Sequence, residues 1–165
     1  MSSLPARRDL RYAEHHERSL RRAKEGRVFT VERKVGRLVE SIMDGRVTLA
    51  DVESADRAMD AAVRSLSGSC VVIADYRRAR FLLEEDAAQL TEMYRRHNNH
   101  IERSAILVSA SSAVAVLQME RVIREARFPS RRAFRDPREA AGWLEEVLAP
   151  LERGRLRVVL SLGLP

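Results

Sequence analysis

The sequence predicts an α/β fold: a single domain in which one mixed β-sheet, with an N-terminal hairpin and parallel strands, carries helices largely on one face. Apolar and polar residues alternate in two segments after residue 28, which indicates the hairpin. Two short apolar runs, at residues 70–74 and 105–108, are separated by helix-patterned sequence. Strands that alternate with helices pair in parallel through crossovers, and 165 residues, 45% of them hydrophobic, suffice for one buried core.

Residues 1–27 are predicted to be a basic N-terminal arm, either helical or flexible. They contain eight Arg or Lys against four Asp or Glu, and so carry most of the formal net charge of +6. Such an arm can bind nucleic acid, anionic lipid or an acidic protein surface through its long-range field. Because Glu14, Glu17 and Glu25 interrupt the positive face, a solvated helix is the preferred interpretation.

A second basic group, the arginines between residues 121 and 135, is denser than the arm. Several of them share one helix face at a spacing of three. Aromatic platforms for bases are absent nearby apart from Phe128 and Phe134. We therefore interpret this group as a solvated face and expect no nucleic-acid partner.

Residues 28–33 and 38–43 alternate with period two, and the residues between them predict a turn, so the two segments form the antiparallel hairpin. Thr48 and Asp51 then match a capping box at the start of a helix. The Thr48 side chain can accept backbone hydrogen bonds, and Asp51 is favourable near the positive end of the helix. Apolar residues at spacings of three and four continue to Leu66, which predicts a helix with one core face.

Residues 70–74 are uniformly apolar, which predicts a central strand covered on both faces. Cys70 heads this strand, and we expect it to be a buried, unreactive thiol. Asp136 and Pro137 suit the start of a helix, because proline fits its first turn. The remaining elements expected, in chain order, are a helix at 84–98, a strand at 106–109, a helix at 113–127, a short edge strand at 132–134 and a helix at 137–151.

Residues 151–165 are predicted to be a C-terminal strand extension. The segment from Gly154 to Leu162 alternates at its start and is rich in strand-forming residues. An exposed apolar strand edge invites association, so this strand either pairs with its own sheet or forms a homodimer.

Location and chemistry are constrained by what the sequence lacks. No stretch approaches the roughly 20 apolar residues that cross a bilayer, and the N-terminus has no apolar signal core, so we expect a cytoplasmic protein. One cysteine permits no internal disulfide. His15 and His16 point to different sides of a helix, and His97 and His100 close a predicted helix, so we expect no metal and no cofactor.

Four sequence segments, in order and spacing, resemble the SpoIIAA-like branch of the STAS domains over residues 28–150. The resemblance implies a four- or five-stranded mixed sheet with helices largely on one face, and a protein-interaction or ligand-binding module rather than an enzyme. The segments are Asp44-Gly45-Arg46-Val47-Thr48, Val71-Val72-Ile73-Ala74-Asp75, Ser104-Ala105-Ile106-Leu107-Val108, and Phe134-Arg135-Asp136 followed by Ala140, Ala141, Trp143 and Leu144.

Regulatory members of that family carry a phosphorylatable serine at the start of the helix after the central strand, where a phosphate changes partner affinity. Residues 75–86 of this chain contain no serine or threonine. Glu84, Glu85 and Asp86 stand at the expected helix start, where negative charge favours the helix dipole. We therefore expect a module without the usual phospho-switch, and interpret these acids as ordinary helix-starting residues.

Two hypotheses for function follow, and neither includes catalytic residues. The first is a cytoplasmic regulatory module that binds a protein partner through the helix after Asp75 and the adjoining loop, with the basic arm as a candidate second contact. The second is a small-ligand or lipid-binding module that uses the serine-rich turn, where open sheets bind ligands, although helix capping is the preferred interpretation of those serines. A flat exposed patch favours the first hypothesis, and a deep apolar pocket beside the serines favours the second. The candidate partner-binding residues are Asp75, Tyr76, Arg77, Arg78 and Phe81, and the candidate ligand-binding residues are Ser109, Ser111 and Ser112.

Overall fold

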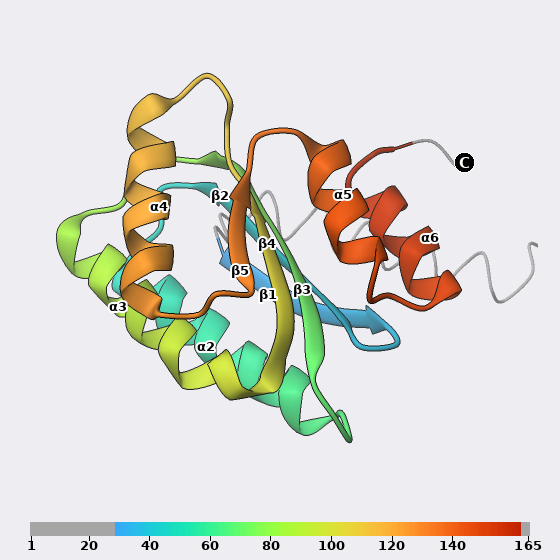
Figure 1. Cartoon of the computed structure of the whole chain (residues 1–165). Coiled ribbons are helices and arrows are strands. Elements are labelled where there is room, and N and C mark those ends of the chain that lie inside the picture. The colour runs from blue at the N-terminus through green and yellow to red at the C-terminus, as the bar shows by residue number, and fades with distance from the viewer. Residues whose placement is uncertain (1–28, 163–165) are drawn as a thin grey trace, which may run out of the picture.

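The computed structural model describes residues 29–162, which form one five-stranded β-sheet with helices on both faces (Figure 1). None of the helices in this range is long and apolar enough to cross a membrane. The strands are β1 (Phe29–Val35), β2 (Leu38–Gly45), β3 (Cys70–Ala79), β4 (Ile101–Leu107) and β5 (Arg131–Phe134). The helices are α2 (Leu49–Arg64), α3 (Glu84–His97), the short 3-10 helix η1 (Asn98–His100), α4 (Ala113–Ala126), α5 (Pro137–Glu145) and α6 (Pro150–Val159).

The strands lie in the order β1-β2-β3-β4-β5, so every neighbour in the sheet is also the next strand in the chain. β1 runs antiparallel to β2, and the pairs from β2 to β5 are parallel, which confirms the predicted mixed sheet. The hairpin turns at Gly36, whose φ of +51° is the left-handed conformation that glycine adopts without steric cost. β5 is the short edge strand that the sequence predicted.

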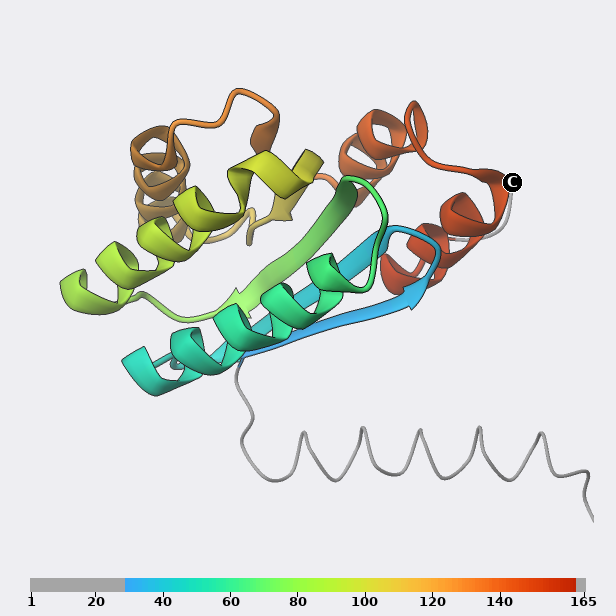
Figure 2. The ribbon, with the colours of Figure 1, turned by 90° about the horizontal axis from the view of Figure 1, so that it is seen from below.

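α2, α3 and α4 pack side by side on one face of the sheet (Figure 2). Each connects two successive parallel strands, and because the strand order advances in one direction, crossovers of one hand place all three helices on the same face. Their buried stripes, such as Val52, Ala55 and Met59 of α2, meet Val72 and Ala74 of β3 in the larger of two apolar cores.

α5 and α6 cover the opposite face and enclose a second, smaller core (Figure 1). Val71 and Ile73 of β3 point into it and pack with Leu144 of α5 and Leu156 of α6. This second core confirms that the apolar central strand is covered on both faces. The expectation of helices largely on one face holds for α2, α3 and α4, and the second layer is an addition to it.

The strand predicted for residues 151–165 is wrong, because Pro150–Val159 form helix α6. The helix predicted for 137–151 also ends earlier, at Glu145, and a turn separates it from α6. Leu156 and Leu160, four residues apart, are both buried in the second core, and this burial outweighs the strand propensity of the segment. The homodimer hypothesis rested on an exposed strand edge and loses that basis. The arm, residues 1–27, lies outside the described residues.

Buried carboxylates attach α6 to the hairpin. Glu152, in the first turn of α6, accepts hydrogen bonds from the backbone N–H groups of Arg37 (2.7 Å) and Ala149 (2.8 Å). Arg155 donates to both oxygens of the buried Glu40 at 2.6 and 2.7 Å. Bidentate pairs of this kind fix geometry as well as charge, so α6 is an integral part of the fold.

Candidate functional site

The candidate site lies at the edge of the sheet where the parallel strands end and α2, α3 and α4 begin. Open α/β sheets bind their ligands at this edge because the loops there are free to vary on a rigid scaffold. β3 is longer than predicted and continues to Ala79, whose segment is still paired with the end of β2. The residues predicted to follow the strand therefore belong to it, and their side chains alternate between its two faces.

Tyr76 lies inside the protein, which removes it from the predicted partner-binding surface. Its side chain is only 4% exposed, and its ring makes an edge contact with Phe29 at a centroid distance of 5.8 Å. The hydroxyl is hydrogen-bonded to Ser41 (3.1 Å) and Tyr94 (3.2 Å). Burial raises the pKa of Tyr76, so this phenol is a neutral core group.

Of the other candidate partner-binding residues of β3, Arg77 and Arg78 are exposed and Asp75 is half-buried. The Asp75 carboxylate accepts two hydrogen bonds from the Arg77 guanidinium, at 2.9 and 2.7 Å, and this bonding raises the pKa of Arg77. Arg78 extends into solvent and pairs with Asp44 at 2.6 Å. Exposed ion pairs of this kind contribute about 1 kcal/mol or less to stability. Asp44 and Arg78 can therefore separate and pair with charged groups of a partner protein at little cost.

The loop between β3 and α3 is held against α4 by one side chain, that of Gln118. The Leu82 N–H donates to Gln118 Oε1 at 2.9 Å, and Gln118 Nε2 donates to the Leu82 carbonyl at 2.7 Å. Leu82 itself is buried, and its neighbours Phe81 and Leu83 are exposed. No local sequence pattern singles out Gln118, because its contact with Leu82 spans 36 residues of the chain.

The Gln118–Leu82 contact joins two segments that each carry two exposed apolar side chains, and we call these four the carboxyl-edge patch: Phe81, Leu83, Val114 and Leu117. Phe81 is 56% exposed and Leu117, which precedes Gln118, is 66% exposed. Val114 lies one turn before Leu117 on the same side of α4. Grouped apolar side chains on a soluble protein mark interaction surfaces, whereas scattered ones need no explanation.

The start of α3 has no phosphorylatable hydroxyl, as the sequence indicated. Its N-cap is Leu83, whose side chain accepts no hydrogen bond. Glu84 and Glu85 stand in the first turn with Asp86, which is buried. Glu84 also pairs with Arg121 of α4 at 2.8 Å, which ties this helix start to the patch.

The serine-rich turn satisfies its own hydrogen bonds. Ser109 and Ser111 join their hydroxyls at 2.9 Å, and the Ser111 N–H donates to Ser109 Oγ at 3.4 Å. Ser112 caps α4 by accepting a hydrogen bond from the Ala115 N–H. These contacts are those of a turn and a helix cap, and they favour the capping interpretation of the three serines.

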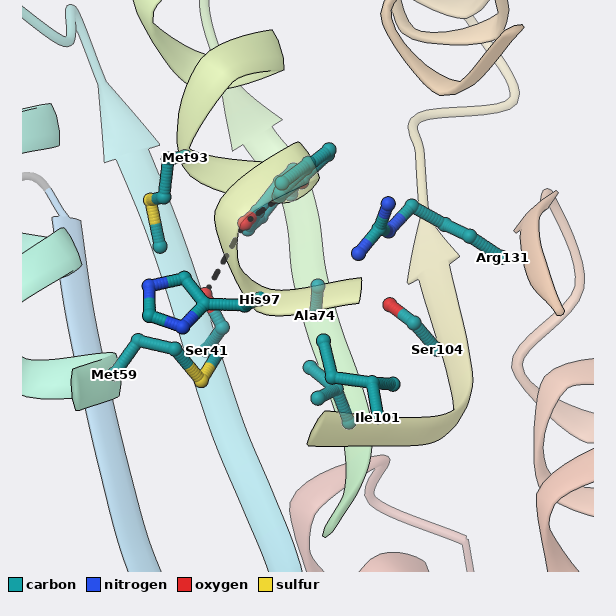
Figure 3. Close-up of a pocket in the computed structure, with 11 residues that line it drawn as sticks. Ser41, Met59, Ala74, Met93, His97, Ile101, Ser104 and Arg131 are labelled. Atoms are coloured by element: carbon teal, nitrogen blue, oxygen red, sulfur yellow. Dashed lines mark hydrogen bonds between the residues drawn. The ribbon is translucent and has the colours of Figure 1, made fainter. Parts of the chain in front are cut away.

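A small cavity lies elsewhere, between the sheet and helices α2 and α3 (Figure 3). Its volume of about 10 Å³ is what one water molecule needs, and the three serines do not line it. His97 stands in its wall, with Nε2 at 2.8 Å from an Asp56 carboxylate oxygen. This His–Asp pair joins α3 to α2, and the cavity gives an organic substrate no room to reach it.

No protein-family model and no curated protein sequence matches the chain. Several solved structures match its fold, among them two that each have a TM-score of 0.53. One is an uncharacterised DUF3478-family protein with a SpoIIAA-like fold from Shewanella loihica PV-4, with 18% identity over 70% of this chain and 91% of that chain. The other is the anti-sigma factor antagonist SpoIIAA in its unphosphorylated form, with 14% identity over 73% of this chain and 99% of that chain. This chain therefore has a SpoIIAA-like fold, as the sequence resemblance implied.

Proposed function

We propose that this chain is a non-enzymatic regulatory module of the cytoplasm, which binds a protein partner through the carboxyl-edge patch. The observation that carries the proposal is the patch itself: four exposed apolar side chains from two segments, locked together by Gln118. Likeness to an anti-sigma factor antagonist supports a regulatory partner protein, since the two chains share the fold that presents this edge.

The patch has the composition of a protein-binding surface. Burying a fully exposed apolar side chain of this size against a partner stabilises the complex by about 1.5–3 kcal/mol. Phe81 and Leu117 are a little over half exposed, so each contributes about half of that free energy. Two ion pairs at the same edge of the sheet, Arg78–Asp44 and Arg121–Glu84, supply charges for a polar rim. Because Gln118 already fixes the loop, binding loses little conformational entropy.

Regulation by phosphate at the start of α3 is not part of the proposal. Leu83 occupies the N-cap, and the neighbouring acids Glu84 and Glu85 give this end a constant negative charge. Leu83 has no hydroxyl that could be phosphorylated, so a partner that recognises this N-cap can bind it at all times. We infer that binding is controlled by the abundance of the partner, or of this chain, and not by modification at this position.

The test is the affinity for a partner captured from the native cell and then purified. The double variant Phe81→Ser/Leu117→Ser should weaken binding by roughly 4- to 12-fold per side chain, the equivalent of about 0.75–1.5 kcal/mol of lost burial each. Val158→Ser is the matched control, because Val158 is 61% exposed but lies on α6, across the sheet. The triple variant Ser109→Ala/Ser111→Ala/Ser112→Ala tests the ligand hypothesis. Loss of binding in the control or the serine variant, with none in the double variant, would refute the proposal.

A further inference from the structure

Four exposed arginines lie where strands β2 and β3 end, next to the carboxyl-edge patch. Three of them, Arg77, Arg78 and Arg80, directly precede Phe81 in the chain, and Arg46 follows the end of β2. We call these four residues the strand-end arginines. Positive charge therefore stands beside an apolar side chain of the patch.

Backbone contacts hold the two strand ends together. Gly45 is the register partner of Ala79, and its carbonyl accepts a hydrogen bond from the Arg80 N–H at 2.8 Å. The helices that follow these strands, α2 and α3, begin side by side (Figure 2). The backbone positions of Arg46 and Arg80 are thus fixed relative to each other.

Nearby carboxylates neutralise only half of this charge. Asp44 and Asp75 pair with two of the four arginines. Within residues 29–162, neither an ion pair nor a side-chain hydrogen bond involves the other two, Arg46 and Arg80. Four arginines less two aspartates leave a net charge of +2. A guanidinium is weakly hydrated for a cation and binds a carboxylate through two parallel hydrogen bonds, so these two side chains suit carboxylates of a partner.

The charge changes sign along the loop that carries the patch. Arg80 precedes Phe81, whereas Glu84 and Glu85 follow Leu83 in the first turn of α3. Glu84 is already paired with an arginine of α4, and Glu85 is exposed. A surface with arginines at one end and carboxylates at the other favours a partner segment of the reverse polarity.

We propose that the partner binds this edge through an amphipathic, acidic segment. Its apolar side chains pack on the carboxyl-edge patch, and its Asp or Glu side chains pair with Arg46 and Arg80. This inference rests on the proposed function and adds the chemistry of the partner. A protein segment is favoured over an anionic membrane, because a uniformly negative lipid surface would repel Glu84 and Glu85.

The first test measures binding of the full chain to the partner purified from the native cell, at low and high salt. Arg46→Gln/Arg80→Gln should weaken binding about 2- to 30-fold in about 0.05 M salt, as expected for two exposed ion pairs, mainly by slowing association. The loss should nearly vanish in about 1 M salt, where the Debye length is about 3 Å. Arg127→Gln is the matched control, because Arg127 is exposed at the opposite end of α4.

The outcomes separate this inference from the proposed function. An inactive arginine variant, with binding still weakened by Phe81→Ser/Leu117→Ser, would overturn the acidic segment and leave the proposed function standing. Binding that is insensitive to the apolar variant would refute the proposed function and this inference with it. Flotation with vesicles of phosphatidylglycerol and phosphatidylcholine, lost in the arginine variant, would identify a membrane and overturn the acidic segment.

Carbodiimide coupling identifies the carboxylates themselves. The variant R80K supplies an amine, which the reagent joins to any Asp or Glu side chain in direct contact. Mass spectrometry should find a coupled partner peptide in which Asp or Glu stands within about two helical turns of large apolar residues. R127K should couple to no partner peptide. A persisting complex without coupling in R80K, or a coupled segment that lacks apolar residues, would contradict the inference.

Discussion

Substitutions in α6 test whether the chain ends in a helix packed on the second core. Leu156 is 0% exposed, whereas Val158 is 61% exposed. In a helix these side chains point about 200° apart, but in a strand they share a face. The two residues therefore separate the structures: Leu156→Ala should be costly and Val158→Ala should not.

The expected magnitude follows from the burial. Removing a fully buried leucine side chain costs about 3 kcal/mol, through lost transfer free energy and the cavity left behind. For a chain of 165 residues this lowers Tm by about 6–12 °C. Val158→Ala should change the free energy of unfolding by less than about 0.5 kcal/mol, because exposed positions contribute little and alanine favours helix.

Urea unfolding, followed by circular dichroism, measures both values. Leu160→Ala, one turn beyond Leu156 and equally buried, should resemble Leu156→Ala. Equal losses for Leu156→Ala and Val158→Ala would show that the two side chains share one environment, and the helix would be refuted.

Three further perturbations test other parts of the structure. Gly45→Ala should cost roughly 1 kcal/mol of stability, because Gly45 has a positive φ but open space around it. Gly36→Ala should cost more, since its added Cβ would also lie 2.2 Å from Glu152 Oε1. Equal urea midpoints for the two variants would contradict this. Burial raises the pKa of Cys70 from 9.0 to about 11, so between pH 9 and 11 the thiol ionises only in the unfolded chain. The stability of the wild type relative to Cys70→Ala should therefore fall by about 2–3 kcal/mol from pH 9 to 11. A difference that does not change with pH would contradict this. Gln118→Ala should cost about 1–3 kcal/mol and speed hydrogen exchange in residues 80–83, and unchanged exchange would mean that Gln118 does not hold the loop.

Elements with a strong local signal could be predicted from the sequence. The period-two alternation of β1 and β2, the apolar run at the start of β3 and the helix start at Asp136–Pro137 all have their origin within a few residues. These local patterns predict the structure correctly because the fold buries the residues that are apolar in the pattern and exposes those that are polar.

The errors arose where distant parts of the chain decide the outcome. α6 contains strand-forming residues, but two distant contacts favour a helix. Glu152 accepts a hydrogen bond from Arg37 of the hairpin, and Leu156 packs in the second core. Tyr76 seemed to follow the strand because charged residues surround it, yet β3 continues past it and turns its side chain inward. No local pattern shows that Tyr94 lies above Arg131, so this buried side chain was grouped with the solvated arginines.

The candidate site was therefore only partly predictable. Arg78 and Phe81 are exposed at the expected edge of the sheet. The other two residues of the patch, Val114 and Leu117, lie in a segment whose sequence pattern predicts only a helix. Its place at this edge depends on the hydrogen bonds by which Gln118 holds α4 against the loop.

Site-specific photo-crosslinking in the native cell tests the central claim most directly. A photoreactive amino acid placed at Leu117 lies within the carboxyl-edge patch, and one at Val158 is similarly exposed on the far side of the sheet. We predict a discrete crosslinked protein partner from position 117 that is absent from position 158 and is lost on adding Phe81→Ser. A partner captured from position 158 and not from position 117 would contradict the proposed interaction surface.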